Sequence, residues 1–305
     1  MEKSTGQFNI PSWTLGGKQL WTDFVQCRGW RIQQNALTHH FRLIDPRNVR
    51  QAWGTREQCQ NQLDAVRSSQ HLEPTGKPIL LLLHGLGRSR NSMSSLAKAL
   101  ADGGGYEVIN VSYASTRASL DEHAAALQSV LEQLPADSKI DVVAHSLGCL
   151  VVRRYLAIEK QRAIDSANGP QFHRIVMLGP PNNGAELAKK LQRTGLVGIV
   201  LGDSARQVAQ LKTTPEIAEL AIPRAEFGII AGNGGIGPIS NPLLRGENDL
   251  FVEVAETKLP GAADFLVVNS AHGLLLEDAT VHQAAASFLA NGYFRSADQR
   301  QPLPK

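Results

Sequence analysis

The spacing of hydrophobic and polar residues changes near residue 75. Before that point, short runs such as residues 20–25 and 41–44 alternate or cluster apolar positions, as in short antiparallel strands. Residues 55–58, T-R-E-Q, have the form of a capping box, and apolar residues then recur at helical intervals to about residue 69. The pattern predicts an N-terminal unit, residues 1–75, made of short strands and one helix.

From residue 76 onward, short apolar stretches alternate with helix-length segments, which is typical of a parallel sheet covered by helices on both faces. The predicted strands are residues 79–83, 106–112, 140–144, 174–178, 227–231 and 265–268. The predicted helices are residues 92–100, 120–134, 147–158 and 281–289. Capping boxes at Ser119 and Thr280 mark two of the helix starts. We therefore expect an α/β domain over residues 76–305, with its ligand site where the carboxyl ends of the strands meet.

Composition and charge narrow the classes of function. The chain has 305 residues, of which 42% are apolar, and its net charge is +3. Basic residues are scattered, so we do not expect nucleic acid as a partner. The longest apolar run, residues 79–83, is far shorter than a membrane span needs. Residues 1–11 lack the apolar segment of a secretory signal, so we expect a cytoplasmic protein, although a secreted protein after removal of its signal would look the same.

The three cysteines, Cys27, Cys59 and Cys149, are too few for a disulfide framework and lack the paired spacing of a zinc site. We expect neither a structural disulfide network nor a bound metal ion.

The sharpest local signal is residues 142–149, V-V-A-H-S-L-G-C, where a buried strand leads directly into Ser146 and a helical pattern follows. A serine on such a sharp turn presents its hydroxyl at the sheet edge, and the crowded turn needs small residues two positions away, here Ala144 and Gly148. This setting predicts a nucleophile, whereas the same five residues elsewhere would read as a helix cap. The N–H of Leu147, at the start of the helix, is a candidate donor to an oxyanion.

A second glycine-containing loop, residues 84–87, H-G-L-G, follows the first parallel strand. Glycines at 85 and 87 let the backbone approach a reacting group, so the N–H of Leu86 is the second candidate oxyanion donor. The alternative is an ordinary turn at a strand exit.

A serine nucleophile needs a base, and His272 is the candidate because it follows the last predicted strand and precedes the final helix. His145, beside the serine, is expected to point away from it. His84 is expected to be a structural hydrogen-bonding residue at a strand end.

The candidate acid is Asp249, which follows the fifth parallel strand and precedes His272, giving the order Ser, acid, His along the chain. Glu253, Glu247 and Asp203 remain alternatives. Glu253 would share a face with Asp249 if residues 250–254 formed a helical turn. Asp264 begins a strand and therefore lies at the wrong end of the sheet.

Residues 232–237 match the dinucleotide-binding pattern G-x-G-x-x-G after a strand. Prolines at 238 and 242 follow, so there is no helix N-terminus to receive a pyrophosphate. We expect no dinucleotide and no other cofactor.

Together these features resemble an α/β-hydrolase of the lipase and esterase group, most of all the small bacterial lipases with an A-H-S-x-G turn and the inositol-deacylase-like lipases. The resemblance is carried by residues 84–87, 144–148, 179–184, 248–252 and 271–273. It implies hydrolysis of a small-molecule ester or lipid through an acyl-serine, without a cofactor. Many relatives have glycine directly after the acid, where this chain has Leu250.

Several alternatives stay open. Thioester hydrolysis or acyl transfer needs the same residues, and a binding protein could keep the fold without turnover. We interpret residues 185–221 as a helical cap whose apolar run, residues 196–201, makes transient contact with a lipid surface; the alternative is that this run packs on the core. No obligate protein partner is expected.

Overall fold

The computed structural model describes residues 12–13, 19–102, 105–162, 171–184, 220–234 and 244–305, and every structural statement below concerns these residues. Their centre is a parallel sheet of six strands in the order β11-β10-β9-β8-β6-β7. The strands are β6 (Ile79–Leu83), β7 (Glu107–Val111), β8 (Lys139–His145), β9 (Gln171–Leu178), β10 (Glu226–Gly232) and β11 (Asp264–Val268). All six lie where the apolar runs predicted them, and they form the parallel sheet that the sequence predicted.

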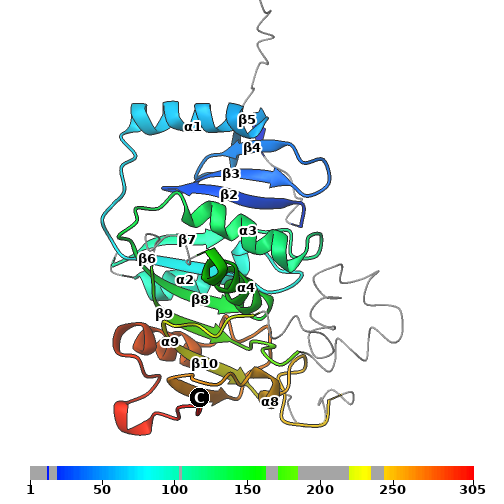
Figure 1. The fold of residues 1–305 in the computed structure, drawn as a ribbon, viewed down its shortest axis with the longest axis vertical. Coiled ribbons are helices and arrows are strands. Elements are labelled where there is room, and N and C mark those ends of the chain that lie inside the picture. The colour runs from blue at the N-terminus through cyan, green and yellow to red at the C-terminus, as the bar shows by residue number, and fades with distance from the viewer. Residues whose placement is uncertain (1–11, 14–18, 103–104, 163–170, 185–219, 235–243) are drawn as a thin grey trace, which may run out of the picture.

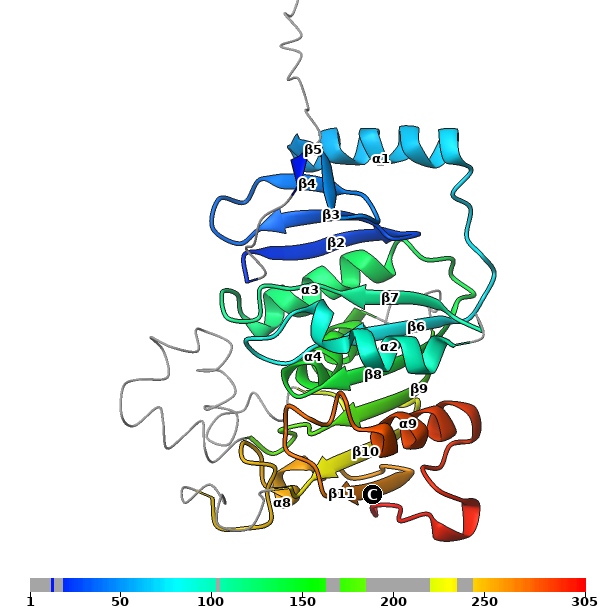
Figure 2. The same ribbon diagram turned by 180° about the vertical axis from the view of Figure 1, so that it is seen from behind.

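Helices cover both faces of this sheet (Figures 1 and 2). On one face lie α3 (Leu120–Leu131) and α4 (Leu147–Arg162), and on the other lie α2 (Ser94–Ala101) and α9 (Ala279–Asn291). In β6, residues 79, 81 and 83 pack with α3 and α4, whereas residues 80 and 82 pack with α2 and α9. This double burial explains why β6 is an unbroken apolar run rather than an alternating one.

The N-terminal residues form a separate antiparallel sheet in the order β1-β5-β4-β3-β2. Its strands are β1 (Ser12–Trp13), β2 (Trp21–Cys27), β3 (Trp30–Asn35), β4 (Phe41–Ile44) and β5 (Val49–Gly54). Helix α1 (Arg56–Gln70) packs on it, placing Cys59 and Leu63 against Val25 and Leu43. The capping box predicted at Thr55 is present. The short antiparallel strands predicted for this region are therefore confirmed.

The two sheets meet where β2 lies beside β7, with α3 packed on β2 (Figure 1). The buried carboxylate of Asp23 accepts hydrogen bonds from the Ser112 N–H at 2.7 Å and from the side chains of Gln26 and Gln33, each at 2.7 Å. The Thr22 hydroxyl accepts from the Ala114 N–H at 3.1 Å. The Asp23 N–H also donates to the Ser112 carbonyl at 2.9 Å. Side chains of β2 and this one backbone hydrogen bond, rather than a continuous strand ladder, thus satisfy polar groups at the edge formed by β7 and the residues after it.

One predicted helix start is wrong. The last helix begins at Ala279 rather than near Val281, because the Asp278 carboxylate accepts a hydrogen bond from the Thr280 N–H at 2.8 Å and makes Asp278 the N-cap. An aspartate is as strong a cap as threonine or better, and its negative charge also suits the helix N-terminus. Most of the predicted cap, residues 185–219, lies outside the described residues. Within the described parts of the chain, no helix combines the length and hydrophobicity needed to cross a membrane.

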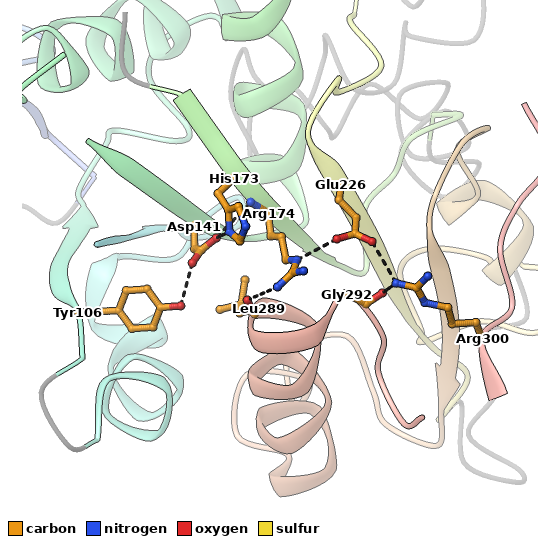
Figure 3. Close-up of polar contacts among 8 residues, drawn as sticks. All are labelled: Tyr106, Asp141, His173, Arg174, Glu226, Leu289, Gly292 and Arg300. Atoms are coloured by element: carbon orange, nitrogen blue, oxygen red, sulfur yellow. Dashed lines mark hydrogen bonds and ion pairs between the residues drawn. The ribbon is translucent and has the colours of Figure 1, made fainter. Parts of the chain in front are cut away.

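The amino ends of the parallel strands are joined to the end of α9 by a polar network (Figure 3). Arg174 donates to Glu226 at 2.9 Å and to the Leu289 carbonyl at 2.9 Å. Arg300 donates to the other Glu226 oxygen at 3.0 Å and also to the Gly292 carbonyl. The network therefore supplies donors to carbonyls at a helix C-terminus, which have no partners within the helix itself.

A second part of the polar network, at the same end of the strands, is centred on Asp141. Its carboxylate accepts from the Tyr106 hydroxyl at 2.8 Å and from the Arg174 N–H at 3.1 Å. Its Oδ1 also lies 2.8 Å from Nδ1 of His173 (Figure 3). This edge is occupied by structural contacts, which leaves the opposite edge for chemistry.

Gly292 gives a test of this network. It ends α9 with φ +79°, and a Cβ there would lie 2.6 Å from both carboxylate oxygens of Glu226. We expect Gly292→Ala to lower the free energy of unfolding by about 2–3 kcal/mol, from backbone strain together with displacement of the carboxylate. Gly76→Ala is the matched control, because Gly76 also has positive φ, +68°, but no atom within 4 Å of such a Cβ. It should cost about 1 kcal/mol in urea unfolding. Equal losses in the two variants would mean that Glu226 moves aside without cost.

Candidate active site

Ser146 lies at the carboxyl end of the sheet, between the last residue of β8 and the first residue of α4. Its φ of +52° is in the left-handed region, which is unfavourable for residues other than glycine. The Ser146 N–H donates to the Leu178 carbonyl of β9 at 2.9 Å, which anchors the turn to the neighbouring strand. The sharp strand-to-helix turn expected from the sequence is present.

Small residues make this turn possible. A Cβ on Gly148 would lie 2.7 Å from the Leu83 carbonyl oxygen and 2.9 Å from that of His84, so α4 begins in direct contact with the backbone of β6. A Cβ on Gly85 would lie 3.1 Å from Cβ of Ser146 and 2.7 Å from Nδ1 of His145. The loop after β6 therefore passes beside the serine at a distance that only glycine permits.

The structure brings the three predicted residues of the site together. Nε2 of His272 lies 2.9 Å from Oγ of Ser146, and its Nδ1 lies 2.6 Å from Oδ2 of Asp249. Asp249 is fully buried, and the His272 side chain is 10% exposed. With Nδ1–H donating to the carboxylate, Nε2 is left as an acceptor that faces the serine hydroxyl. This arrangement can remove a proton from Oγ.

Backbone groups hold the Asp249 carboxylate in place. Its Oδ1 accepts from the N–H groups of Phe251 at 3.0 Å and Val252 at 2.8 Å, while Oδ2 faces His272. The His272 N–H in turn donates to the Asp249 carbonyl at 2.9 Å. Leu250, which follows the acid directly, adopts φ +83°, a conformation that glycine adopts more readily than leucine.

The alternative acids are placed differently. Glu253 precedes α8 (Val254–Thr257), and its carboxylate accepts from the Arg245 N–H at 2.9 Å. No helical turn spans residues 250–254, so the condition for Glu253 to share a face with Asp249 is not met. No hydrogen bond in the described chain brings the Glu247 carboxylate to His272, and Asp203 lies outside the described residues. Asp264 is at the amino end of its strand, as expected, and accepts from Phe294 and Gln301 N–H groups at 2.8 and 2.9 Å.

The two predicted oxyanion donors flank Ser146. Leu147 is the first residue of α4, where backbone N–H groups have no partner within the helix. Leu86 follows Gly85 in the loop that passes beside the serine. Within the described residues, neither N–H donates to a backbone carbonyl. Their role as an oxyanion hole remains a prediction.

Two histidines next to the site have structural contacts. His145 does not pair with the serine: its Nε2 lies 3.0 Å from the His272 carbonyl oxygen, and the two rings are 4.7 Å apart. Burial, followed by the nearby His272 and Arg88, lowers the pKa of His145 well below its usual value. His84 has its Nδ1 2.9 Å from the Gly85 carbonyl oxygen and stacks on Tyr113. The sequence predicted a structural role for His84, but nothing in it indicated the support that His145 gives to His272.

The glycines of the G-x-G-x-x-G pattern also have a structural explanation. A Cβ on Gly232 would lie 2.4 Å from the Ser270 carbonyl oxygen, and one on Gly234 would lie 2.4 Å from the Ser270 carbonyl carbon. These glycines therefore let the chain after β10 pack against the segment that carries His272. Cys149 is fully buried, donates to the Ala144 carbonyl at 3.1 Å, and has a thiol whose pKa is raised by burial, so it is not a competing nucleophile.

Comparison with solved structures identifies the fold. A lipase of Bacillus licheniformis, BlEst2 in its propeptide form, matches 75% of this chain and 53% of its own length, with 16% identity and a TM-score of 0.53. The chain thus spans about half the length of that lipase. The metagenomic carboxyl esterase MGS0156 matches 65% of each chain, with 20% identity and a TM-score of 0.49. The protein has an α/β-hydrolase fold, which it shares with that lipase.

The sequence family can also be stated. Residues 42–222, more than half of the chain, match the model of a domain of unknown function, DUF7379, and the protein belongs to this family. The matched region contains Ser146 and both predicted oxyanion donors but ends before Asp249 and His272. A comparison with curated proteins finds no match.

Leu250 gives a test of the strained turn beside the acid. Because its φ of +83° costs about 1–3 kcal/mol for a residue with a side chain, we expect Leu250→Gly to keep or raise the free energy of unfolding. Leu250→Val should lower it by about 1–2 kcal/mol, since β-branched residues tolerate this region poorly. Urea unfolding of the two variants checks the signs. A larger loss for glycine than for valine would show that packing of the leucine side chain outweighs the backbone strain.

The buried histidines predict how stability depends on pH. Burial lowers the pKa of His84 and of His123 to about 4, and it lowers that of His145 as well. Between the usual histidine pKa of about 6.5 and pH 4, the unfolded chain binds protons that the folded chain does not. The free energy of unfolding should therefore fall as pH falls, by about 1.4 kcal/mol per pH unit for each such proton.

Urea unfolding at several pH values between about 7.5 and 4.5 measures this slope. The variant His123→Leu, away from the serine, should reduce the slope of the free energy of unfolding against pH by the contribution of about one proton. An unchanged slope would mean that His123 is already protonated in the folded protein.

Proposed function

We propose that this protein is a serine hydrolase that cleaves carboxylic esters through an acyl-serine intermediate. The observation that carries the proposal is the pair of short contacts at His272, 2.9 Å to Oγ of Ser146 and 2.6 Å to the Asp249 carboxylate. Serine is a weak nucleophile at its usual pKa, and these contacts supply both a base and a group that orients the base.

In the first half of the reaction, Oγ of Ser146 attacks the ester carbonyl carbon while Nε2 of His272 accepts the hydroxyl proton. The carbonyl oxygen becomes an oxyanion, for which the N–H groups of Leu86 and Leu147 are the proposed donors. Asp249 stabilises the imidazolium that forms. When the tetrahedral intermediate collapses, His272 gives the proton to the alcohol, which leaves.

In the second half, a water molecule gives a proton to His272 and attacks the acyl-serine carbonyl. Collapse of this second intermediate releases the carboxylic acid and returns the proton to Ser146. The strained Ser146 backbone supports this cycle because it holds Oγ in one position before the substrate arrives. The fold shared with a bacterial lipase fits the same reaction class.

The experiment is turnover of 4-nitrophenyl esters of increasing acyl length, with an acyl-CoA thioester in parallel. Ser146→Ala should lower kcat by about 10⁴-fold or more, since removal of the nucleophile leaves only the oxyanion donors and binding. Asp249→Asn should lower kcat/KM by at least about 10²-fold, because His272 is then left without its orienting acceptor. Faster turnover of the thioester than of any oxygen ester would contradict the proposal that oxygen esters are the substrates and would indicate a thioesterase.

Glu253→Gln and Asp203→Asn are the matched controls for the acid, and each should change kcat/KM by less than about tenfold. Circular dichroism verifies that every variant is folded. Strong labelling of Ser146→Ala by a fluorophosphonate probe would contradict Ser146 as nucleophile, and a greater loss in either control than in Asp249→Asn would contradict Asp249 as acid.

A further inference from the structure

Arg88 ends the glycine loop that passes beside Ser146. Its N–H donates to the Gly85 carbonyl at 3.2 Å, which closes the loop into a turn. Its side chain reaches the segment of the proposed base: a Cβ built on Gly273 would lie 2.1 Å from Nη2 of Arg88 and 3.3 Å from its Cζ. The guanidinium therefore lies against the residue that directly follows His272.

This guanidinium has no acidic partner within the described part of the chain. Other arginines there do have partners: Arg174 and Arg300 share Glu226, and Arg154 pairs with Asp121. Arg153 donates to the Ala221 and Asn182 carbonyls. By contrast, no carboxylate of the described residues lies within 4.0 Å of the Arg88 side chain, and none of its guanidinium N–H groups makes a hydrogen bond to those residues.

The position is half-buried, so the missing partner matters. A guanidinium presents five donors in a planar fork that fits the two oxygens of a carboxylate or the oxygens of a phosphate. The nearest acid of the site, Asp249, is fully buried and already accepts from Phe251, Val252 and His272. The acceptors of the described residues therefore leave the Arg88 guanidinium available to an anionic group of a molecule that binds beside His272.

The charge of Arg88 acts on two buried histidines beside the site. After burial and the effect of His272, Arg88 is a further cause of the lowered pKa of His145, and it acts on His84 in the same direction. The positive charge therefore acts on the interior of the site, where it would attract an anionic group of a bound substrate.

Exposed apolar side chains lie near the same segment. The ring of Phe251 is 5.5 Å from the ring of His272 and the residue is 56% exposed, and Leu274, directly after Gly273, is 58% exposed. Large apolar residues this exposed beside a site offer contact surface for a hydrocarbon chain. The surroundings of His272 therefore combine one unpaired cation with apolar surface.

We propose that Arg88 selects esters that carry an anionic group, either a carboxylate or a phosphate, with the hydrocarbon part of the substrate on Phe251 and Leu274. This inference rests on the proposed ester hydrolysis at Ser146 and names the substrate class for that site. A bidentate charged contact accounts for the selection, since guanidinium and carboxylate or phosphate pair through two parallel hydrogen bonds.

The test compares two esters of equal chain length: 4-nitrophenyl hexanoate, which is neutral, and mono-4-nitrophenyl adipate, which ends in a carboxylate. The wild-type protein should prefer the adipate by about tenfold or more in kcat/KM. Arg88→Gln should abolish this preference, mainly through a higher KM for the adipate, and should leave hexanoate turnover within about threefold. Arg88→Lys should restore part of the preference, because lysine keeps the charge but not the planar fork.

Arg90→Gln is the control, since it removes an equal charge from the same region and should leave the preference unchanged. A 4-nitrophenyl ester that carries a phosphonate in place of the terminal carboxylate of the adipate shows which of the two anions is preferred. Equal losses for both esters in Arg88→Gln, or an anionic preference that survives it, would overturn the assignment.

Binding separates this inference from the proposed hydrolysis. In Ser146→Ala, monomethyl adipate should bind more tightly than methyl hexanoate, and adding Arg88→Gln should remove the difference. If the wild-type protein hydrolyses neither 4-nitrophenyl ester, the proposed function fails, while this binding comparison still decides the role of Arg88. Equal binding of the two methyl esters would refute the role of Arg88 whatever the outcome for turnover.

Discussion

The contact between the first turn of α4 and the backbone of β6 is the constraint on which the rest of the site depends. Gly148 allows it, because any side chain there would meet the Leu83 and His84 carbonyl oxygens. Two residues before this contact, the chain leaves β8 through the left-handed conformation of Ser146. The same closeness brings the loop at Gly85 beside the serine. One short helix-to-strand distance therefore positions Ser146, the proposed nucleophile, together with the loop that carries Leu86 and the helix start at Leu147.

The other half of the site is assembled by main-chain contacts between segments far apart in sequence. His272 is held through its N–H by the Asp249 carbonyl and through its own carbonyl by His145. Gly232 and Gly234 let the end of β10 pack against Ser270, two residues before the histidine. Because the imidazole is fixed by its backbone as well as by the carboxylate, little reorganisation is needed before a proton can move. The scaffold thus arranges the side chains before a substrate binds.

The sequence predicted the features that depend on residues close together in the chain better than those that depend on tertiary contacts. The six parallel strands and the turn at Ser146 depend on neighbours in the chain, and local apolar patterns were sufficient for them. Asp249 and His272 could be proposed from chain order alone, because the carboxyl ends of parallel strands lie along one edge. The contact of His145 with His272, the position of Arg88 against Gly273 and the backbone of Leu250 depend on tertiary contacts, which no local pattern encodes. The start of α9 was misplaced because two capping signals compete there, and Asp278 is the one used.

The way in which β2 meets β7 has a consequence for self-association. Asp23, Thr22 and Gln26 satisfy polar groups of Ser112, Ala114 and Asn110 at this edge of the parallel sheet without adding a strand to it. An uncovered strand edge is a template for pairing with another molecule. The region matched by the family begins at residue 42, after β2 and β3. A fragment that began at residue 42 would keep Ser146 and its loops but would lack β2, so the edge strand β7 would be left uncovered. We therefore expect β2 to protect this edge from pairing with a strand of another molecule.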